Sequence, residues 1–492
     1  MPAPDFLYSI PALRELEARG SAAAGDPRAL MVRAGQAAWR TALEHWPGAR
    51  RLLVVCGPGN NGGDGFELAR NALRAGRQVT VLQWGSRELA GAAAAARAGW
   101  EQDGGETLRA GEELPEADLL VDALFGIGLS RAPEGAAERL VRAINRHPAP
   151  VLALDVPSGL DAGSGHAPGV AVMAEHTVEF IAPKAGMRTG AARDLTGSLS
   201  LADLQVTVDP QALSPAAECM DAEYLRRWLG PRRRDSHKGR HGRVLCVGGD
   251  HGHGGAIMLA AEGALRAGAG LVDVRTRPVH VGPLLARLPE AMARGCDGGR
   301  DGMVALPRPD VIAIGPGLGQ HEWGSGLLLA ALSAGRPLVL DADALNLLSV
   351  SPQVLPPGSI ITPHPGEAGR LLGSSSGDVQ ADRFGAAGAL ARRLGVVVVL
   401  KGAGTLVAAP GRTTRLVDAG NPGMAVAGMG DVLTGVIAAL LAQGLDAFDA
   451  AACGALLHAC AGDLAAVRGE RGLLPRDLLP ELRRLANLEH AG

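Results

Sequence analysis

The feature that most constrains the fold is the repeated succession of a short apolar run and a helix-forming stretch. In the first half, the apolar runs lie at 52–56, 79–83, 119–122 and 151–155, with helical stretches such as 66–75 and 135–146 between them. Strands that alternate with helices at this spacing predict a parallel sheet covered by helices on both faces. Residues 11–45 and 87–100 are expected to be helical too.

A second series follows a segment rich in Pro, charge and turn residues, 205–240, which is typical of a linker. Its strands are expected at 243–247, 271–275, 311–314, 338–341, 360–362 and 396–400, and apolar helices at 432–443 and 450–468. No short internal repeat occurs. The 492 residues are therefore predicted to form two three-layer α/β domains, a Rossmann-like one at 1–215 and a second at 222–492.

Charge and cysteine usage narrow the functional classes. A net charge of −3 argues against a general nucleic-acid binder, and the run at 232–234 is interpreted as solvated linker, not a phosphate-binding patch. No apolar run is expected to reach the roughly 18 residues that span a bilayer, and the N-terminus carries acids where a signal peptide is apolar. The six cysteines form no CxxC pair, which argues against structural zinc. We expect a cytoplasmic protein with neither a nucleic-acid partner nor a membrane one.

The first predicted strand runs directly into Gly57-Pro58-Gly59-Asn60-Asn61-Gly62-Gly63-Asp64-Gly65. Three of these glycines satisfy the dinucleotide fingerprint GxGxxG. However, Gln83 stands where an acidic residue would hold a ribose, and no GK[ST] of a P-loop follows. The segment is either an unusual ligand loop or a glycine-rich turn without a ligand.

Two further strand ends carry polar residues. Asp122 precedes a loop that contains Gly126-Ile127-Gly128, and Asp155 precedes Ser158. In a parallel sheet these loops share one edge, so Asn61, Asp122 and Ser158 are candidate oxygen ligands of a cation. Arg131 and nearby backbone N–H groups are candidate phosphate contacts. A single Asp at a strand end is equally often structural.

The strongest motif of the second half is Gly428-Met429-Gly430-Asp431 at the start of an apolar helix. Free backbone N–H groups and the positive helix end attract an anion there. Asp431, just inside the start of the helix, can accept a proton from a substrate hydroxyl, as phosphoryl transfer requires. The alternative is that Asp431 is a helix N-cap.

Several other strand-end loops favour an anion-binding site at Gly428 to Asp431 over a simple helix N-cap. They are Val247-Gly248-Gly249 with Gly254-Gly255-Ala256, Gly315-Pro316-Gly317-Leu318-Gly319, Asp341 to Asn346, Thr362 to Glu367, and Lys401-Gly402-Ala403-Gly404-Thr405. His364 lies between two prolines and is a candidate substrate contact. His251 and His253 have HxH spacing but no evident third ligand, which disfavours a metal site.

The segments GPGNNGGDG, DALFGIGLSR, DVPSGLDA and FIAPKAG together resemble the NAD(P)H-hydrate epimerase domain, over about residues 6–215. The resemblance implies interconversion of the R and S epimers of NADHX and NADPHX, which are nicotinamide nucleotides hydrated on the reduced ring. It implies potassium at Asn61, Asp122 and Ser158. The implied substrate contacts are Asn60, Asn61, Gly62, Gly63, Asp64, Gly126, Ile127, Gly128, Leu129, Ser130, Arg131, Ala132 and Asp155.

Asp155 is the candidate catalytic acid–base group of this domain. Epimerisation of a carbinolamine-like carbon requires a proton to move as its C–O or C–N bond opens. The sequence leaves open which of the two bonds opens.

The segments HKGRHGRVLCVGGDHGHGGA, GPGLG, DADALNLL, TPHPGEA, KGAGT and NPGMAVAGMGDVLTG resemble the ribokinase-like ADP- or ATP-dependent NAD(P)H-hydrate dehydratase, over about residues 225–492. The resemblance implies that only the S epimer is dehydrated, with ADP or ATP and Mg²⁺, to NADH or NADPH, AMP or ADP, and phosphate. The implied substrate contacts are Ala256, Leu318 or an adjacent position, His364 and catalytic Asp431. The implied nucleotide contacts are Lys401, Gly402, Ala403, Gly404, Thr405 and Gly430.

The sequence is also compatible with two other functions. One is a small-molecule kinase with an attached binding domain, which would release a phosphorylated product. The other is a nucleotide sensor without turnover, against which the intact Asn61, Asp122, Asp155 and Asp431 argue. ADP and ATP are not distinguished, and large apolar helices favour a homo-oligomer.

Overall fold

The computed structural model describes residues 5–487 apart from 27, 86–87, 112, 130 and 298–307. The chain forms two compact units, Asp5–Ala217 and a second that begins at Glu218. Each unit buries its own hydrophobic core, so each is described by itself.

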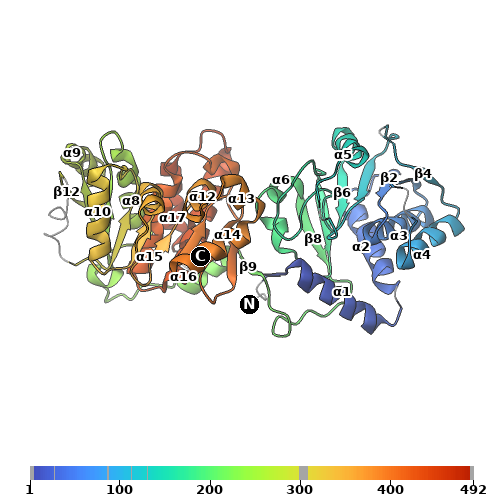
Figure 1. The fold of residues 1–492 in the computed structure, drawn as a ribbon, viewed down its shortest axis with the longest axis horizontal. Helices are drawn as coiled ribbons and strands as arrows, with labels where there is room; N and C mark the ends of the chain where they lie inside the picture. The colour runs from blue at the N-terminus through green and yellow to red at the C-terminus, as the bar shows by residue number, and fades with distance from the viewer. Residues whose placement is uncertain are drawn as a thin grey trace. The chain divides into compact units, whose positions relative to one another are not determined.

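The first unit is built on a parallel sheet (Figure 1). Among the described residues the strand order is β4-β3-β2-β5-β6-β7-β8, and the paired neighbours run parallel. After a short β1 (Asp5–Leu7), the strands are Arg51–Cys56 (β2), Gln78–Gln83 (β3), Thr107–Arg109 (β4), Leu119–Ala123 (β5), Val151–Leu154 (β6), His176–Phe180 (β7) and Ser198–Ala202 (β8). The chain leaves β2 and β5 in opposite directions, which creates the switch point where such sheets bind ligands.

Helices cover both faces of this sheet. Leu52 and Val54 pack with α1–α4, whereas Leu53 and Val55 pack with α5, because successive strand residues point to opposite faces. The helices are Ile10–Ala24 (α1), Ala29–His45 (α2), Asn60–Arg74 (α3), Gly91–Gln102 (α4), Ala136–Arg146 (α5), 3-10 helix Ala185–Arg188 (η1) and Ala192–Leu195 (α6).

Two predicted boundaries in this unit are wrong. The expected helix at 11–45 is two helices, because Gly25 adopts a left-handed φ of 68° that ends α1. Helix α3 begins at Asn60 and not near 66, so most of the glycine-rich segment is helical. A Cβ on Gly62 would lie 2.0 Å from the Gly57 carbonyl oxygen. Only a glycine at position 62 therefore lets the first turn of α3 pack against the backbone that follows β2.

The second unit has a mixed sheet. Among its described residues the order is β9-β18-β17-β16-β15-β14-β13-β10-β11-β12, in which β10 to β16 are parallel and β17 and β18 antiparallel. The strands are Ala217–Met220 (β9), Arg243–Val247 (β10), Leu271–Thr276 (β11), Met292–Gly295 (β12), Val311–Ile314 (β13), Leu338–Leu340 (β14), Ile360–Ile361 (β15), Val397–Leu400 (β16), Thr405–Ala408 (β17) and Thr414–Val417 (β18). Its switch point lies between β10 and β13.

The helices of this unit again form layers on the sheet. The α-helices are Leu225–Trp228 (α7), Gly254–Arg266 (α8), Pro278–Arg287 (α9), Glu322–Ser333 (α10), Ala342–Val350 (α11), Pro365–Leu372 (α12), Ser376–Ala381 (α13), Arg383–Leu394 (α14), Met429–Ala442 (α15), Ala447–Ala465 (α16) and Pro475–Leu485 (α17). Helices α8, α15, α16 and α17 share one core with the strands. Since α15 begins at Met429, Gly430 and Asp431 lie in its first turn and not ahead of it.

Two expectations are corrected in this unit. The segment 205–240 is not wholly a linker, because β9 and α7 lie within it and Met220 and Leu225 are buried in the core. Residues Ala447–Arg468 are long and apolar enough to cross a membrane, contrary to the expectation that no run is. However, 67% of that apolar window is buried inside the protein, as expected for a core helix.

Helices α8 and α15 contact each other backbone to backbone. A Cβ on Gly435 would lie 1.9 Å from the Ala260 carbonyl oxygen. We expect Gly435→Ala to lower the free energy of unfolding by about 1–3 kcal/mol, because the helices must separate. Denaturant unfolding measures the change. Gly282→Ala, a helical position with open space around it, is the control, and equal effects of both variants would contradict the prediction.

Candidate active sites

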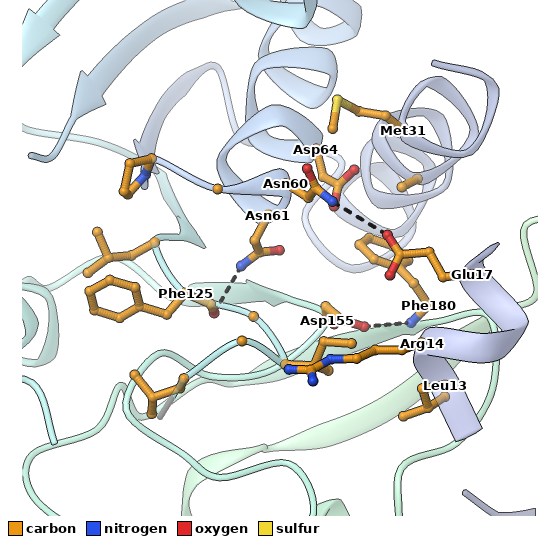
Figure 2. Close-up of a pocket in the computed structure, with 18 of the residues that line it drawn as sticks. Leu13, Arg14, Glu17, Met31, Asn60, Asn61, Asp64, Phe125, Asp155 and Phe180 are labelled. Atoms are coloured by element: carbon orange, nitrogen blue, oxygen red, sulfur yellow. Dashed lines mark hydrogen bonds between the residues drawn. The ribbon is translucent and has the colours of Figure 1, made fainter. Parts of the chain in front are cut away.

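A cavity of about 1170 Å³ opens at the switch point of the first unit. Helix α1, the loops after β2 and β5, and the segment after β6 line it (Figure 2). Of the predicted substrate contacts, the lining contains Asn60, Asn61, Asp64, Gly126, Ile127, Gly128, Leu129, Arg131, Ala132 and Asp155. The cavity therefore brings together residues from three separate motifs.

The remaining predicted contacts of this group are placed differently. Ser130 lies outside the described residues. Gly62 and Gly63 are buried, and a Cβ on Gly63 would lie 2.5 Å from the Met31 sulfur. Both glycines thus serve the packing of α3.

Asn61, Asp122 and Ser158 form one buried cluster beside the cavity. The Ser158 hydroxyl donates to Asp122 Oδ1 at 2.7 Å, and the Ser158 N–H donates to Oδ2 at 2.8 Å. Burial raises the pKa of Asp122 to about 6, against the lowering effect of these hydrogen bonds. Asn61 donates to the Phe125 carbonyl at 3.0 Å, whereas its buried Oδ1 accepts no hydrogen bond. The Ser158 hydroxyl lies 3.3 Å from the same Phe125 carbonyl oxygen, which links Asn61 to the pair of Ser158 and Asp122. An orphaned buried oxygen in such a cluster suits a cation that prefers oxygen ligands.

Asp155 occupies a strained position in the cavity wall. Its backbone φ is 66°, which is uncommon for a residue other than glycine and is concentrated at functional sites. Its Oδ1 lies 2.7 Å from Nζ of Lys184, which is almost fully buried, and accepts a hydrogen bond from the Phe180 N–H at 3.1 Å. These two contacts fix the carboxylate at the cavity wall, and Figure 2 shows the one to Phe180.

The second unit gathers its predicted residues around a buried ion pair. Lys401 Nζ, after β16, lies 2.5 Å from Oδ1 of Asp341, after β14. Thr434 donates to the other carboxylate oxygen at 3.0 Å. Burial alone would raise the pKa of Asp341, but Lys401 and these hydrogen bonds lower it below its usual value. A Cβ on Gly430 would lie 3.2 Å from both Lys401 Nζ and Asp341 Oδ2, so the GxGD turn rests on this pair.

The loop Lys401 to Thr405 is held from inside by a fully buried arginine. Arg383 Nη2 donates to the carbonyl oxygens of Leu400, Lys401 and Gly404, each at 3.3 Å. Gly402 and Ala403 are exposed, as a loop that receives a ligand requires. Arg383 therefore fixes the shape of this loop.

Asp431 lies in the first turn of α15 and is partly exposed. Burial, reinforced by Asp341 and opposed by Lys401, raises its pKa to about 6. Its side chain does not cap the helix, since Gly428 is the N-cap. A carboxyl that titrates near neutral pH beside a helix N-terminus can exchange a proton with a ligand.

The other predicted contacts of the second unit lie on two sides of its switch point. His364 is exposed and is the N-cap of α12, where its Nδ1 accepts the Gly366 N–H at 3.0 Å. Ala256 is partly exposed near the start of α8. Leu318 is fully buried, so its side chain cannot meet a ligand and only the loop backbone remains available. His251 and His253 belong to no group of three potential metal ligands among the described residues.

Comparison with known proteins matches both units. Residues 244–484 match the family described as NAD(P)H-hydrate dehydratase, and 27–186 match the YjeF-related protein N-terminus. The bifunctional NAD(P)H-hydrate repair enzyme of Escherichia coli is 47% identical over 94% of this chain and 90% of its own length. The enzyme of that name from Coxiella burnetii is 45% identical over 98% and 99%. The chain belongs to the bifunctional NAD(P)H-hydrate repair enzymes.

A solved structure agrees with the fold of the dehydratase unit. A ribokinase-like superfamily protein of Enterococcus faecalis has a TM-score of 0.51 and 32% identity, and covers 55% of this chain and 95% of its own. The predicted pair of α/β domains, Rossmann-like and ribokinase-like, is confirmed.

Several residues of both sites were not assigned from the sequence of this repair enzyme. In the YjeF-related unit they are Lys184 and, on α1, Arg14 and Glu17, which line the cavity. In the dehydratase unit they are Arg383, which holds the loop that begins at Lys401, and Asp341, which pairs with Lys401. Lys184 and Asp341 lie within recognised motifs, which was an available signal. Nothing local distinguishes Arg383 or the α1 residues from ordinary helix residues.

We expect Asp431→Asn to stabilise the dehydratase unit at pH 8 but not at pH 4. The pKa of Asp431 is raised from 3.8 to about 6 in the folded state. Between pH 3.8 and about 6 the folded protein therefore binds more protons at this residue than the unfolded chain does, so the free energy of unfolding falls as the pH rises through this range. The amide removes this loss, which amounts to no more than about 3 kcal/mol. Unfolding temperatures at both pH values measure it. The exposed Glu322→Gln is the control, and a gain for Asp431→Asn that is equal at both pH values would contradict the prediction.

Proposed function

We propose that this chain repairs hydrated nicotinamide nucleotides in two steps. The YjeF-related unit interconverts the R and S epimers of NADHX and NADPHX, and the dehydratase unit converts the S epimer to NADH or NADPH. The observation that carries the proposal is 47% identity over 94% of the chain to an enzyme with the name bifunctional NAD(P)H-hydrate repair enzyme. The two activities complement each other, because hydration yields both epimers and dehydration uses one.

In the dehydratase unit, the nucleotide phosphates would bind Lys401, Gly402, Ala403, Gly404, Thr405 and Gly430. Transfer of the terminal phosphoryl group to the ring hydroxyl makes that oxygen a good leaving group, and Asp431 accepts the hydroxyl proton. Loss of phosphate and of the neighbouring ring proton restores the reduced nicotinamide. The raised pKa of Asp431 and its place in the first turn of α15 support this role.

His364, Ala256 and the backbone near Leu318 would contact the nicotinamide nucleotide from the other side of this site. Mg²⁺ would neutralise the charge of the transferring phosphates. Asp431 and Asp343, whose negative charges repel each other, would supply carboxylate oxygens of the kind it binds. ADP or ATP serves as phosphoryl donor, and the remaining AMP or ADP leaves with phosphate. A homo-oligomeric state and a cytoplasmic location complete the proposal.

In the YjeF-related unit, potassium would bind Asn61, Asp122 and Ser158. The orphaned Asn61 Oδ1 supports this site, because a cation would satisfy an oxygen that no donor reaches. The bound cation would hold the loops after β2, β5 and β6 together at the cavity. Asp155 would move the proton during epimerisation.

Recovery of absorbance at 340 nm from mixed R and S NADPHX, with Mg²⁺ and either ADP or ATP, tests both activities. We expect the wild type to recover all the NADPH and Asp155→Asn only the S fraction rapidly, since its acid–base group is lost. Asp431→Asn should recover neither fraction yet still epimerise. Accumulation of phosphorylated substrate without NADPH would favour a kinase, and no turnover at all would contradict the proposal.

Potassium is expected to raise the unfolding temperature of the YjeF-related unit relative to tetramethylammonium at equal ionic strength, because it binds only the folded state. Asn61→Ala and Asp122→Asn should reduce this rise and weaken potassium activation of epimerisation at least about tenfold. Glu44→Gln, on the exposed surface of α2, is the control. An unchanged potassium response in both site variants would exclude the site.

A further inference from the structure

Asp155 is not the only carboxyl group that lines the cavity of the YjeF-related unit, and the function above gives the others, Asp64 among them, no chemical role. Asp64 projects from α3, whereas Asp155 follows β6, and both line the same cavity. Figure 2 shows the two carboxyl groups entering from different walls, with Asp64 on the helical side and Asp155 on the strand side. A flat ring bound between these walls would present one face to each carboxyl group.

The two carboxyl groups have different partners. Asp155 is bound to the Lys184 ammonium and to the Phe180 N–H. Within the described part of the chain, Asp64 has neither a hydrogen bond nor an ion pair, although it is only partly exposed. The cation that would stabilise a second carboxylate is already engaged, since Lys184 also donates to the Phe180 carbonyl at 3.2 Å.

The charges around Asp64 favour its protonated form. Asp155, Glu17 on α1 and Glu67 on α3 repel a negative charge on Asp64. The positive charge of Arg14, on α1, is exposed to solvent and so does little to offset this repulsion. Burial, followed by these three acids, raises the pKa of Asp64 well above its usual range. Of the carboxyl groups that line the cavity, Asp155 is paired with the Lys184 ammonium, whereas the surroundings of Asp64 favour its protonated form. This arrangement suits paired acid and base catalysis.

We propose that Asp64 is the second catalytic group of the epimerisation, which protonates the hydroxyl leaving one ring face while Asp155 deprotonates the water entering the other. This inference rests on the proposed epimerase function and deepens it. It selects opening of the C–O bond from the two routes that the sequence left open, because opposed acid and base groups match exchange of water across a planar carbon.

The step balances without an oxidant or reductant. Asp64 gives its proton to the hydroxyl, the C–O bond breaks with its electron pair on oxygen, and water leaves. The lone pair of the adjacent ring nitrogen forms a C=N bond and carries the positive charge. A new water bonds to this carbon from the opposite face and transfers its proton to Asp155. The product is the other epimer, and one proton has passed from Asp64 to Asp155, ready for the reverse reaction.

Epimerisation of NADPHX in ¹⁸O-labelled water, without ADP or ATP, tests the proposal on the wild-type protein. Chromatography gives the epimer ratio and mass spectrometry gives the label, each corrected for the spontaneous reaction. We expect one ¹⁸O incorporated per enzymatic epimerisation event. Epimerisation with retention of ¹⁶O would overturn the proposal, whereas no epimerisation at all would overturn the proposed function instead.

Asp64→Asn tests the residue itself, because the amide keeps the size of the side chain but is not an acid. We expect kcat to fall by about 10²–10⁴ with KM changed less than about threefold. Glu44→Gln is the matched control, and ADP-dependent dehydration of the S epimer by the Asp64→Asn chain reports on its dehydratase unit. A kcat within about threefold of the wild type would overturn the assignment.

Discussion

Close approach of backbone to backbone at the two switch points is the constraint on which both sites depend. A Cβ on Gly57, after β2, would lie 1.8 Å from the Leu124 carbonyl oxygen after β5. A Cβ on Gly248, after β10, would lie 2.1 Å from the Pro316 carbonyl oxygen after β13. Glycine alone permits these contacts, so each unit can bring two diverging loops together and leave polar groups facing a ligand between them.

The two units share an electrostatic arrangement as well. Each fixes a strand-end aspartate with a lysine, Asp155 with Lys184 at 2.7 Å and Asp341 with Lys401 at 2.5 Å. Each unit also has a second carboxyl group with a raised pKa near this pair. It is Asp431 in the dehydratase unit and Asp64, on α3, in the YjeF-related unit. Burial separates the protonation states of neighbouring acids, so one site can hold both an acid and a base at neutral pH.

Much of the fold and of both candidate sites could be predicted, because the positions of strand ends in a parallel sheet follow from the sequence pattern. Asn61, Asp122 and Ser158 were grouped in this way, and the structure brings them into one cluster. The predictions failed where packing outweighed local propensity. Gly62 was read as loop although it is helical, and α16 is apolar because it is a core helix. Leu318 or an adjacent position stays a predicted contact, for which the burial of the Leu318 side chain leaves the loop backbone.

The sequence by itself determined two α/β domains, their order and the strand-end loops that carry the chemistry, because periodicity and glycine spacing are local properties. Only the tertiary structure decided which charges meet. Arg383 donates a hydrogen bond to the carbonyl oxygen of Lys401, 18 residues further along the chain, and so fixes the loop from Lys401 to Thr405. Helix α1 contributes Glu17 to a cavity formed mainly by distant loops. The protonation state of Asp64 depends on burial and on acids from three separate elements, a sum that no local pattern contains.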